Sequence, residues 1–119
     1  MALEGVWTTE VCGPFGWECV GVLVMGNGAA AGGNNNHFSI GRYSEVDGNI
    51  EIELMIDFYG TPRSIFGVKE KTLDVRITGN WDGEMIAGTA YRPQDPGLSV
   101  ECRLRRRAEL PGGFSKSSA

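Results

Sequence analysis

Residues 49–58 read NIEIELMIDF, and this stretch decides the fold class. Every second side chain in it is apolar: Ile50, Ile52, Leu54, Ile56 and Phe58. The side chains between them are mostly acidic. Because successive side chains of a β-strand point to opposite faces of a sheet, this period of two predicts a strand with one face in a core and the other in water.

Similar short strands are expected on both sides of this stretch, separated by turn signals. Gly and Pro punctuate residues 13–16, and Asp-Gly pairs at 47–48 and 82–83 favour tight hairpins. The glycine- and asparagine-rich residues 26–36 are expected to form a flexible connection with no packed element. Eight strands are predicted, at about residues 3–10, 17–25, 37–45, 49–58, 64–68, 71–79, 84–91 and 98–107.

Eight strands with short connections predict an all-β fold, an eight-stranded antiparallel up-and-down barrel that removes its free edges by closing on itself. A β-sandwich is the alternative fold. The 119 residues suit one core, so residues 1–110 are expected to form a single β-barrel domain. Residues 111–119 are small and polar, which predicts a disordered C-terminal tail.

The charge is divided unequally along the chain. Residues 1–102 hold 14 acids and 6 bases, a net charge of −8, whereas residues 103–119 hold 1 acid and 5 bases, a net charge of +4. An acidic body repels the phosphate backbone, so no direct nucleic-acid partner is expected. A basic protein partner suits this body better.

The apolar runs and the first residues of the chain indicate where the protein is located in the cell. The chain has no apolar run of about 18 residues, which predicts no membrane span. Its first residues lack the basic and apolar regions of a signal peptide, so we expect a cytoplasmic protein with reduced thiols.

Few residues are candidates for chemistry. The three cysteines form no C-x-x-C pair, and His37 has no second ligand at metal-binding spacing, so no metal site is expected. A lone histidine beside a loop is expected to be a surface hydrogen-bonding residue. Since the chain also lacks a Gly-x-Ser-x-Gly motif, we expect a non-enzymatic protein without a cofactor.

The segment Gly5-Val6-Trp7 begins the first predicted strand. Lipocalin/calycin-like barrels carry a Gly-x-Trp element at this place, where the glycine lets the chain bend inward and the tryptophan closes the base. In that superfamily a basic side chain near the end of the last strand stacks on the tryptophan. The alternation of the last strand makes Arg106 the candidate here. The alternative is a core tryptophan with an unrelated exposed arginine.

The order of elements over residues 20–58 resembles the GrlR-like family, small negative regulators of type III secretion genes. The similarity consists of a glycine-rich segment after an apolar strand, an aromatic-x-x-Gly-x-Tyr stretch from Phe38 to Tyr43, and an acidic turn before the alternating strand. The resemblance implies a lipocalin-like barrel that forms a homodimer. It also implies binding to a DNA-binding transcriptional activator, which keeps that activator from its promoter.

The resemblance also marks candidate partner-binding residues. The family uses a Glu-Asp-Glu-Asp loop for the activator, and this chain has Glu45-Val46-Asp47-Gly48 at the matching turn, so Glu45 and Asp47 correspond. Together with Glu51 and Glu53 of the next strand, they are expected to form an acidic docking surface. A solvated face that keeps the sheet soluble is the alternative.

The leading expectation is therefore a regulatory binding protein that sequesters a basic protein partner. The second, apolar face of residues 17–25 favours a homodimer. The alternative is a lipocalin-like protein that binds a small apolar molecule inside the barrel. Inward-pointing bulky side chains would fill so small a barrel and argue against a ligand: Phe38, Ile52, Leu54, Ile56 and Leu73.

Overall fold

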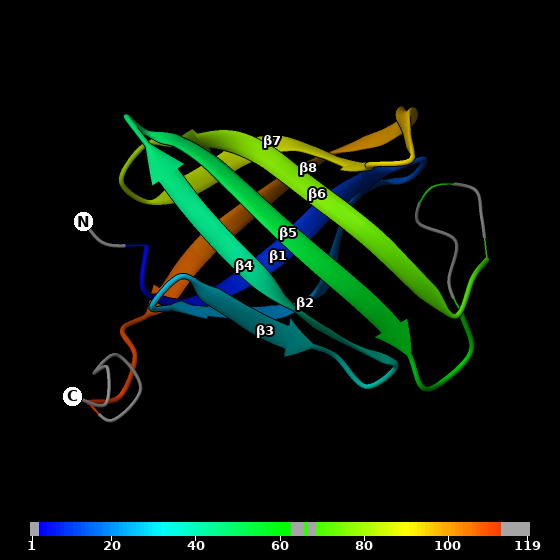
Figure 1. The fold of residues 1–119 in the computed structure, drawn as a ribbon, viewed down its shortest axis with the longest axis horizontal. Coiled ribbons are helices and arrows are strands. Elements are labelled where there is room, and N and C mark those ends of the chain that lie inside the picture. Colours follow the sequence, from blue (N-terminus) through cyan, green and yellow to red (C-terminus); the bar gives the residue numbers. More distant parts are fainter. Residues whose placement is uncertain (1–2, 63–65, 67–68, 113–119) are drawn as a thin grey trace.

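Eight antiparallel strands form one closed barrel in the computed structural model, which describes residues 3–62, 66 and 69–112. Each strand pairs with its neighbours in the sequence, and β8 pairs with β1, so the topology is up and down (Figure 1). The predicted fold class is confirmed. The strands are β1 (Gly5–Gly13), β2 (Gly16–Gly26), β3 (Ala29–Gly33), β4 (His37–Val46), β5 (Asn49–Phe58), β6 (Thr72–Trp81), β7 (Met85–Arg92) and β8 (Asp95–Ala108).

The structure corrects the expectation for residues 26–36. This stretch is not a flexible connection, because it contains β3, which pairs with β2 on one side and β4 on the other. Asn27 and Gly28 form the preceding turn with φ angles of 52° and 78°. Positive φ at both central residues is the requirement of a tight type I′ hairpin, for which Asn-Gly is a preferred pair. Alanine and glycine have little strand preference of their own, and pairing on both sides holds them in the sheet.

The predicted strand at 64–68 falls mainly outside the described residues. Its one described residue, Phe66, is buried and lies in a bend. The strand predicted at residues 98–107 begins earlier than expected, because β8 already starts at Asp95.

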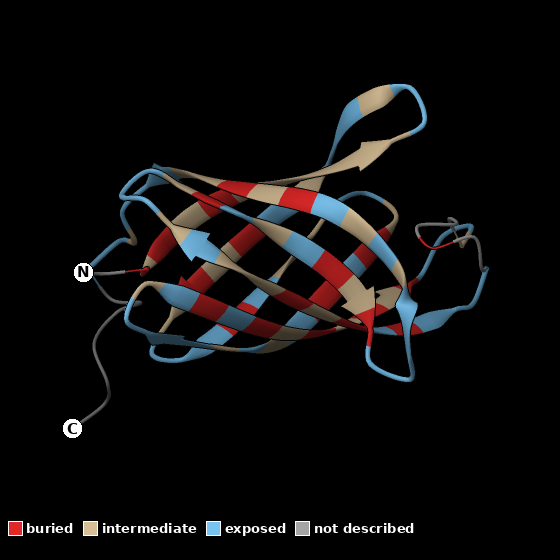
Figure 2. Ribbon diagram, turned by 90° about the horizontal axis from the view of Figure 1, so that it is seen from above, coloured by how far each residue is buried: buried red, intermediate tan, exposed pale blue. Residues whose placement is uncertain are grey.

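The barrel wall follows the alternation seen in the sequence. In β5 the apolar set is buried and the residues between them face outward, which gives the banded burial along the strands in Figure 2. Ile52, Leu54, Ile56 and Leu73 point inward as expected. Phe38 does not, since 41% of its surface is exposed and its neighbours His37 and Ser39 are buried instead.

The arginines of β8 join it to β1. Arg103 donates a hydrogen bond to the carboxylate of Glu10, which holds the pKa of that carboxyl below its usual value. The Arg103 guanidinium carbon also lies 3.9 Å from the ring centroid of Trp17 in β2, a cation–π contact. Arg107 Nε donates to Thr8 Oγ1 at 2.9 Å. Arg103 and Arg107, which belong to the basic end of the chain, therefore make contacts within the barrel.

Trp7 closes one end of the barrel. Its side chain is fully buried, its ring meets Trp81 edge to face with centroids 5.1 Å apart, and its Nε1 donates to the backbone oxygen of Leu3 at 2.8 Å. This geometry satisfies the one polar atom of the indole while both rings fill the barrel end.

Gly5 and Arg106 belong to the same end. A Cβ on Gly5 would lie 2.7 Å from the Ala108 oxygen and 2.8 Å from Arg106 Nε, and its φ of 153° is one that other residues rarely adopt. Arg106 donates from Nε and Nη2 to the backbone oxygen of Glu4 at 3.0 and 2.8 Å. It thus ties the chain entering β1 to the end of β8.

Replacement of Trp7 by alanine should lower the free energy of unfolding by about 3–5 kcal/mol, the range for removing a core aromatic ring. Trp17→Ala is the matched control, because Trp17 is 39% exposed and its loss leaves no internal cavity. Urea denaturation followed by circular dichroism measures both. Equal midpoints for Trp7→Ala and the parent would contradict the closing role of Trp7.

Candidate functional site

Glu45 and Asp47 lie on the β4–β5 hairpin, at the end closed by Trp7. Both are exposed, and Asp47-Gly48 forms the predicted tight turn with φ angles of 53° and 83°. The backbone nitrogen of Trp81 donates to the oxygen of Gly48 at 3.1 Å, so the turn is bonded to the end of β6. The two carboxylates are therefore presented on an anchored turn.

Glu51 and Glu53 both face outward from β5 but have different surroundings. Glu51 is exposed and lines a surface groove of about 630 Å³ that crosses β4 to β7. Glu53 accepts a hydrogen bond from Arg76 Nη2 at 3.1 Å. Glu51 therefore lines the groove, whereas the exposed Glu45 and Asp47 of the hairpin do not line it and Glu53 is already in an ion pair.

The groove beside the acidic hairpin is walled by short side chains. Val46, 68% exposed, is a large apolar residue at its edge, between Glu45 and Asp47 in the chain. An open groove of this kind suits a segment of another protein better than a small molecule, which would stay largely in water. The other outward-facing residues that line it are Ser44, Asn49, Thr78, Asn80, Ala87 and Thr89.

A second surface feature is apolar. The strand registers align Val24, Ala31, Ile40 and Met55 in one row across the outside of β2 to β5. Phe38, with 41% of its surface exposed, and Ile40, with 49%, stand out from this outer face. An outward row of apolar side chains of this kind is typical of a surface that another molecule covers.

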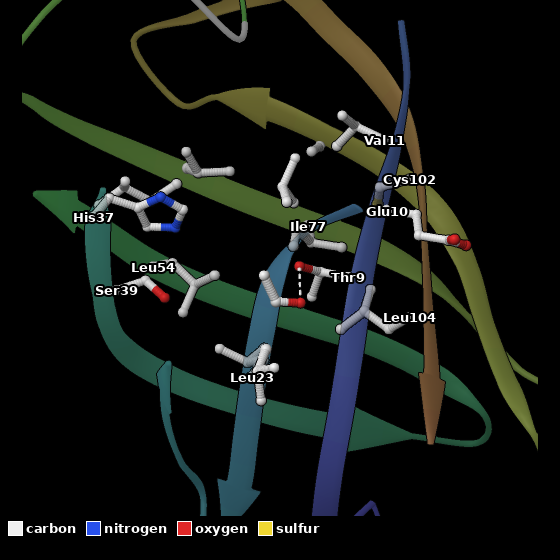
Figure 3. Close-up of a pocket in the computed structure, with 16 residues that line it drawn as sticks. Thr9, Glu10, Val11, Leu23, His37, Ser39, Leu54, Ile77, Cys102 and Leu104 are labelled. Carbon is white, nitrogen blue, oxygen red and sulfur yellow. Dashed lines mark hydrogen bonds between the residues drawn. The ribbon is translucent and has the colours of Figure 1, made fainter. Parts of the chain in front are cut away.

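The half of the barrel away from Trp7 contains a cavity (Figure 3). Its inner part has a volume of about 60 Å³ and almost wholly apolar walls. An outer part of about 100 Å³ lies at the mouth. The two parts share three lining residues, Val11, Val20 and His37, so they adjoin one another.

His37 and Ser39 are the polar side chains of β4 in this cavity. Figure 3 shows both pointing inward, across from Thr9 and Cys102. His37 is buried, which corrects the expectation of a surface residue, and its ring meets Phe58 edge to face at 5.5 Å. The alternation of β4 places His37 and Ser39 on one face and Phe38 on the other, but it does not say which face points inward.

The pKa of the Cys102 thiol is consistent with an apolar cavity wall. Burial raises the pKa of its thiol to about 12, because the charged thiolate is disfavoured away from water. Cys12 is half-buried at the mouth and Cys19 is exposed, and all three cysteines are free thiols.

Comparisons with known proteins identify no family for this chain. No protein-family model matches the chain, and no curated protein is significantly similar to it. Within residues 3–62, 66 and 69–112, no three His, Cys, Asp or Glu side chains are grouped to hold a metal ion. In the same residues no helix has the length and apolar composition needed to span a membrane.

Proposed function

We propose that this protein is a non-enzymatic regulatory binding protein that sequesters a basic protein partner through the β4–β5 hairpin. The observation that carries the proposal is that Glu45, Asp47 and Glu51 are all exposed on the β4–β5 hairpin, where Glu51 also lines a groove. None of the three forms an ion pair within the described part of the chain, whereas Glu10 and Glu53 do. Carboxylates left in water beside a groove are available to a cationic partner.

A DNA-binding transcriptional activator is the partner class that we propose. Such proteins neutralise phosphates with lysine and arginine, so their DNA-binding surface is strongly basic. The acidic surface of this protein can bind the basic surface of the activator. DNA can then no longer bind to that basic surface. This competition is the physical basis of repression by sequestration. From the resemblance to the GrlR-like family, we further propose that the activator controls type III secretion genes. We also propose that this protein acts in the cytoplasm.

The second part of the proposal is a homodimer formed through the outer apolar face of β2 to β5. In the row Val24, Ala31, Ile40 and Met55, no charged side chain interrupts the apolar surface. Covering such a row contributes about 25 cal/mol per Å² of apolar area. The acidic hairpin tip lies at the closed end of the barrel, so both hairpins of the dimer stay open to partners.

The double variant Glu45→Lys with Asp47→Lys should weaken partner binding about tenfold or more at low ionic strength, and less at moderate salt. Affinity capture from the native host first supplies the partner, and calorimetric titration at two salt concentrations then measures its affinity. Asp74→Lys with Asp95→Lys is the matched control, because it changes the net charge equally at exposed acids outside the β4–β5 hairpin.

If the hairpin variant and the parent bound the partner with equal affinity at low salt, the docking surface would lie elsewhere on the protein. The competition is tested separately by adding promoter DNA to the complex of this protein with its partner. The proposal predicts that DNA and this protein displace each other, and a stable ternary complex would contradict sequestration.

The parent should have the mass of a dimer in sedimentation equilibrium, and Ile40→Glu should have that of a monomer. A carboxylate in the middle of an apolar interface loses its water without gaining a partner. Thr72→Glu, an exposed outward position on β6, is the control and should remain dimeric. A parent that stays monomeric to high micromolar concentration would rule out this dimer.

A further inference from the structure

We propose that the cavity at the open end of the barrel binds one small uncharged molecule, made of a single apolar ring or short apolar chain with one hydroxyl or carbonyl group. The molecule extends from the inner cavity into the mouth, and its polar group lies beside His37, which lines both parts, and Ser39. This site goes beyond the proposed docking function, because the acidic hairpin lies at the opposite, closed end of the barrel.

The cavity exists because small side chains face inward in this half of the barrel. Ala90, Ser39 and Cys102 line its wall, whereas Trp7 and Trp81 fill the other end. Gly21 also contributes, since a Cβ there would lie 2.6 Å from the Gly33 oxygen and its φ is 144°. Close approach of β2 and β3 at this point leaves no side chain to fill the space.

The volume sets the size of the ligand. An apolar cavity of about 150 Å³ holds a benzene ring, and drug-sized ligands need about 300–1,000 Å³. The inner part of about 60 Å³ is too small for a ring by itself, and only together with the adjoining outer part of about 100 Å³ does it approach the smaller figure. A single ring with a short substituent therefore has to extend across both parts, and the larger ligands of wide barrels do not fit.

The walls set the chemistry of the ligand. The inner cavity is enclosed mainly by aliphatic side chains, which include Leu23, Leu54 and Ile77. The Ser39 hydroxyl can donate or accept a hydrogen bond, whereas the Asn34 amide at the mouth already bonds to the backbone of Val20, Asn36 and His37. A molecule with one apolar end and one polar end matches this gradient from the interior to the mouth.

Charge excludes carboxylate ligands. Among the described residues neither part of the cavity is lined by an arginine or lysine, and Glu18 lines the mouth. Glu10 also borders the cavity, but Figure 3 shows its carboxylate turned away, toward its ion pair with Arg103. A buried carboxylate would have no cation to pair with, so an uncharged polar group is favoured.

The test is an NMR titration of the full chain with three matched probes: p-cresol, toluene and 4-methylbenzoate. We expect p-cresol to cause saturable shifts confined to resonances of cavity residues. Toluene should bind about tenfold more weakly, because it lacks the hydrogen bond, and 4-methylbenzoate should not bind.

Filling the cavity should remove binding. Ala90→Leu places a larger side chain on the inner wall and should weaken p-cresol binding at least tenfold, whereas Ala87→Leu, exposed on the outside of the same strand, should leave it unchanged. Cys102→Leu fills the cavity from β8 and replaces Ala90→Leu if that variant does not fold. His37→Phe should reduce the preference for p-cresol over toluene.

Three results would overturn the proposal. The first is the absence of saturable shifts with p-cresol at concentrations up to about 10 mM, well above the millimolar affinity of a weak fragment. The second is undiminished binding to a folded Ala90→Leu or Cys102→Leu variant. The third is binding of 4-methylbenzoate as tight as that of p-cresol.

Discussion

The pairing of β1 with β8 is the constraint on which the rest of the molecule depends. Without it the sheet would be open, with two long edges and no enclosed interior. The sequence concentrates its arginines on β8, where Arg103 binds Glu10 and Trp17, Arg106 binds the backbone of Glu4, and Arg107 binds Thr8. Of these contacts, the one between Arg103 and Glu10 joins opposite charges across the seam. The acidic excess that remains lies on the rest of the barrel.

Closure gives the two ends of the barrel different characters. At one end Trp7 and Trp81 fill the interior, and the Asp47-Gly48 turn is bonded to the backbone of Trp81. At the other end small inward residues leave a cavity whose mouth reaches His37. The proposed docking hairpin therefore lies at the filled end, and the proposed ligand cavity lies at the other end of the same barrel.

The sequence predicts the fold well where the period of two is strong. In β5 the alternation identifies strand, register and buried face together, and the Asp-Gly turn fixes where the hairpin closes. The prediction fails in β3, because Ala29 to Gly33 carry no alternation and pairing with β2 and β4 supplies the order. The cavity depends on whether His37 or Phe38 faces inward, a shift of one residue that local pattern leaves undetermined. The ion pair of Glu53 with Arg76 joins residues 23 positions apart, so it too needed the sheet register.

The most direct test of this account is the set of nuclear Overhauser effects between β1 and β8. The register opposes Thr9 to Leu104 and Val11 to Cys102, so cross-strand contacts between backbone protons of these residues should appear alongside those of the seven sequential hairpin pairs. Their presence at the expected positions would establish the closed barrel and its seam together. Their absence, with the other strand pairs intact, would mean an open sheet and would contradict the account.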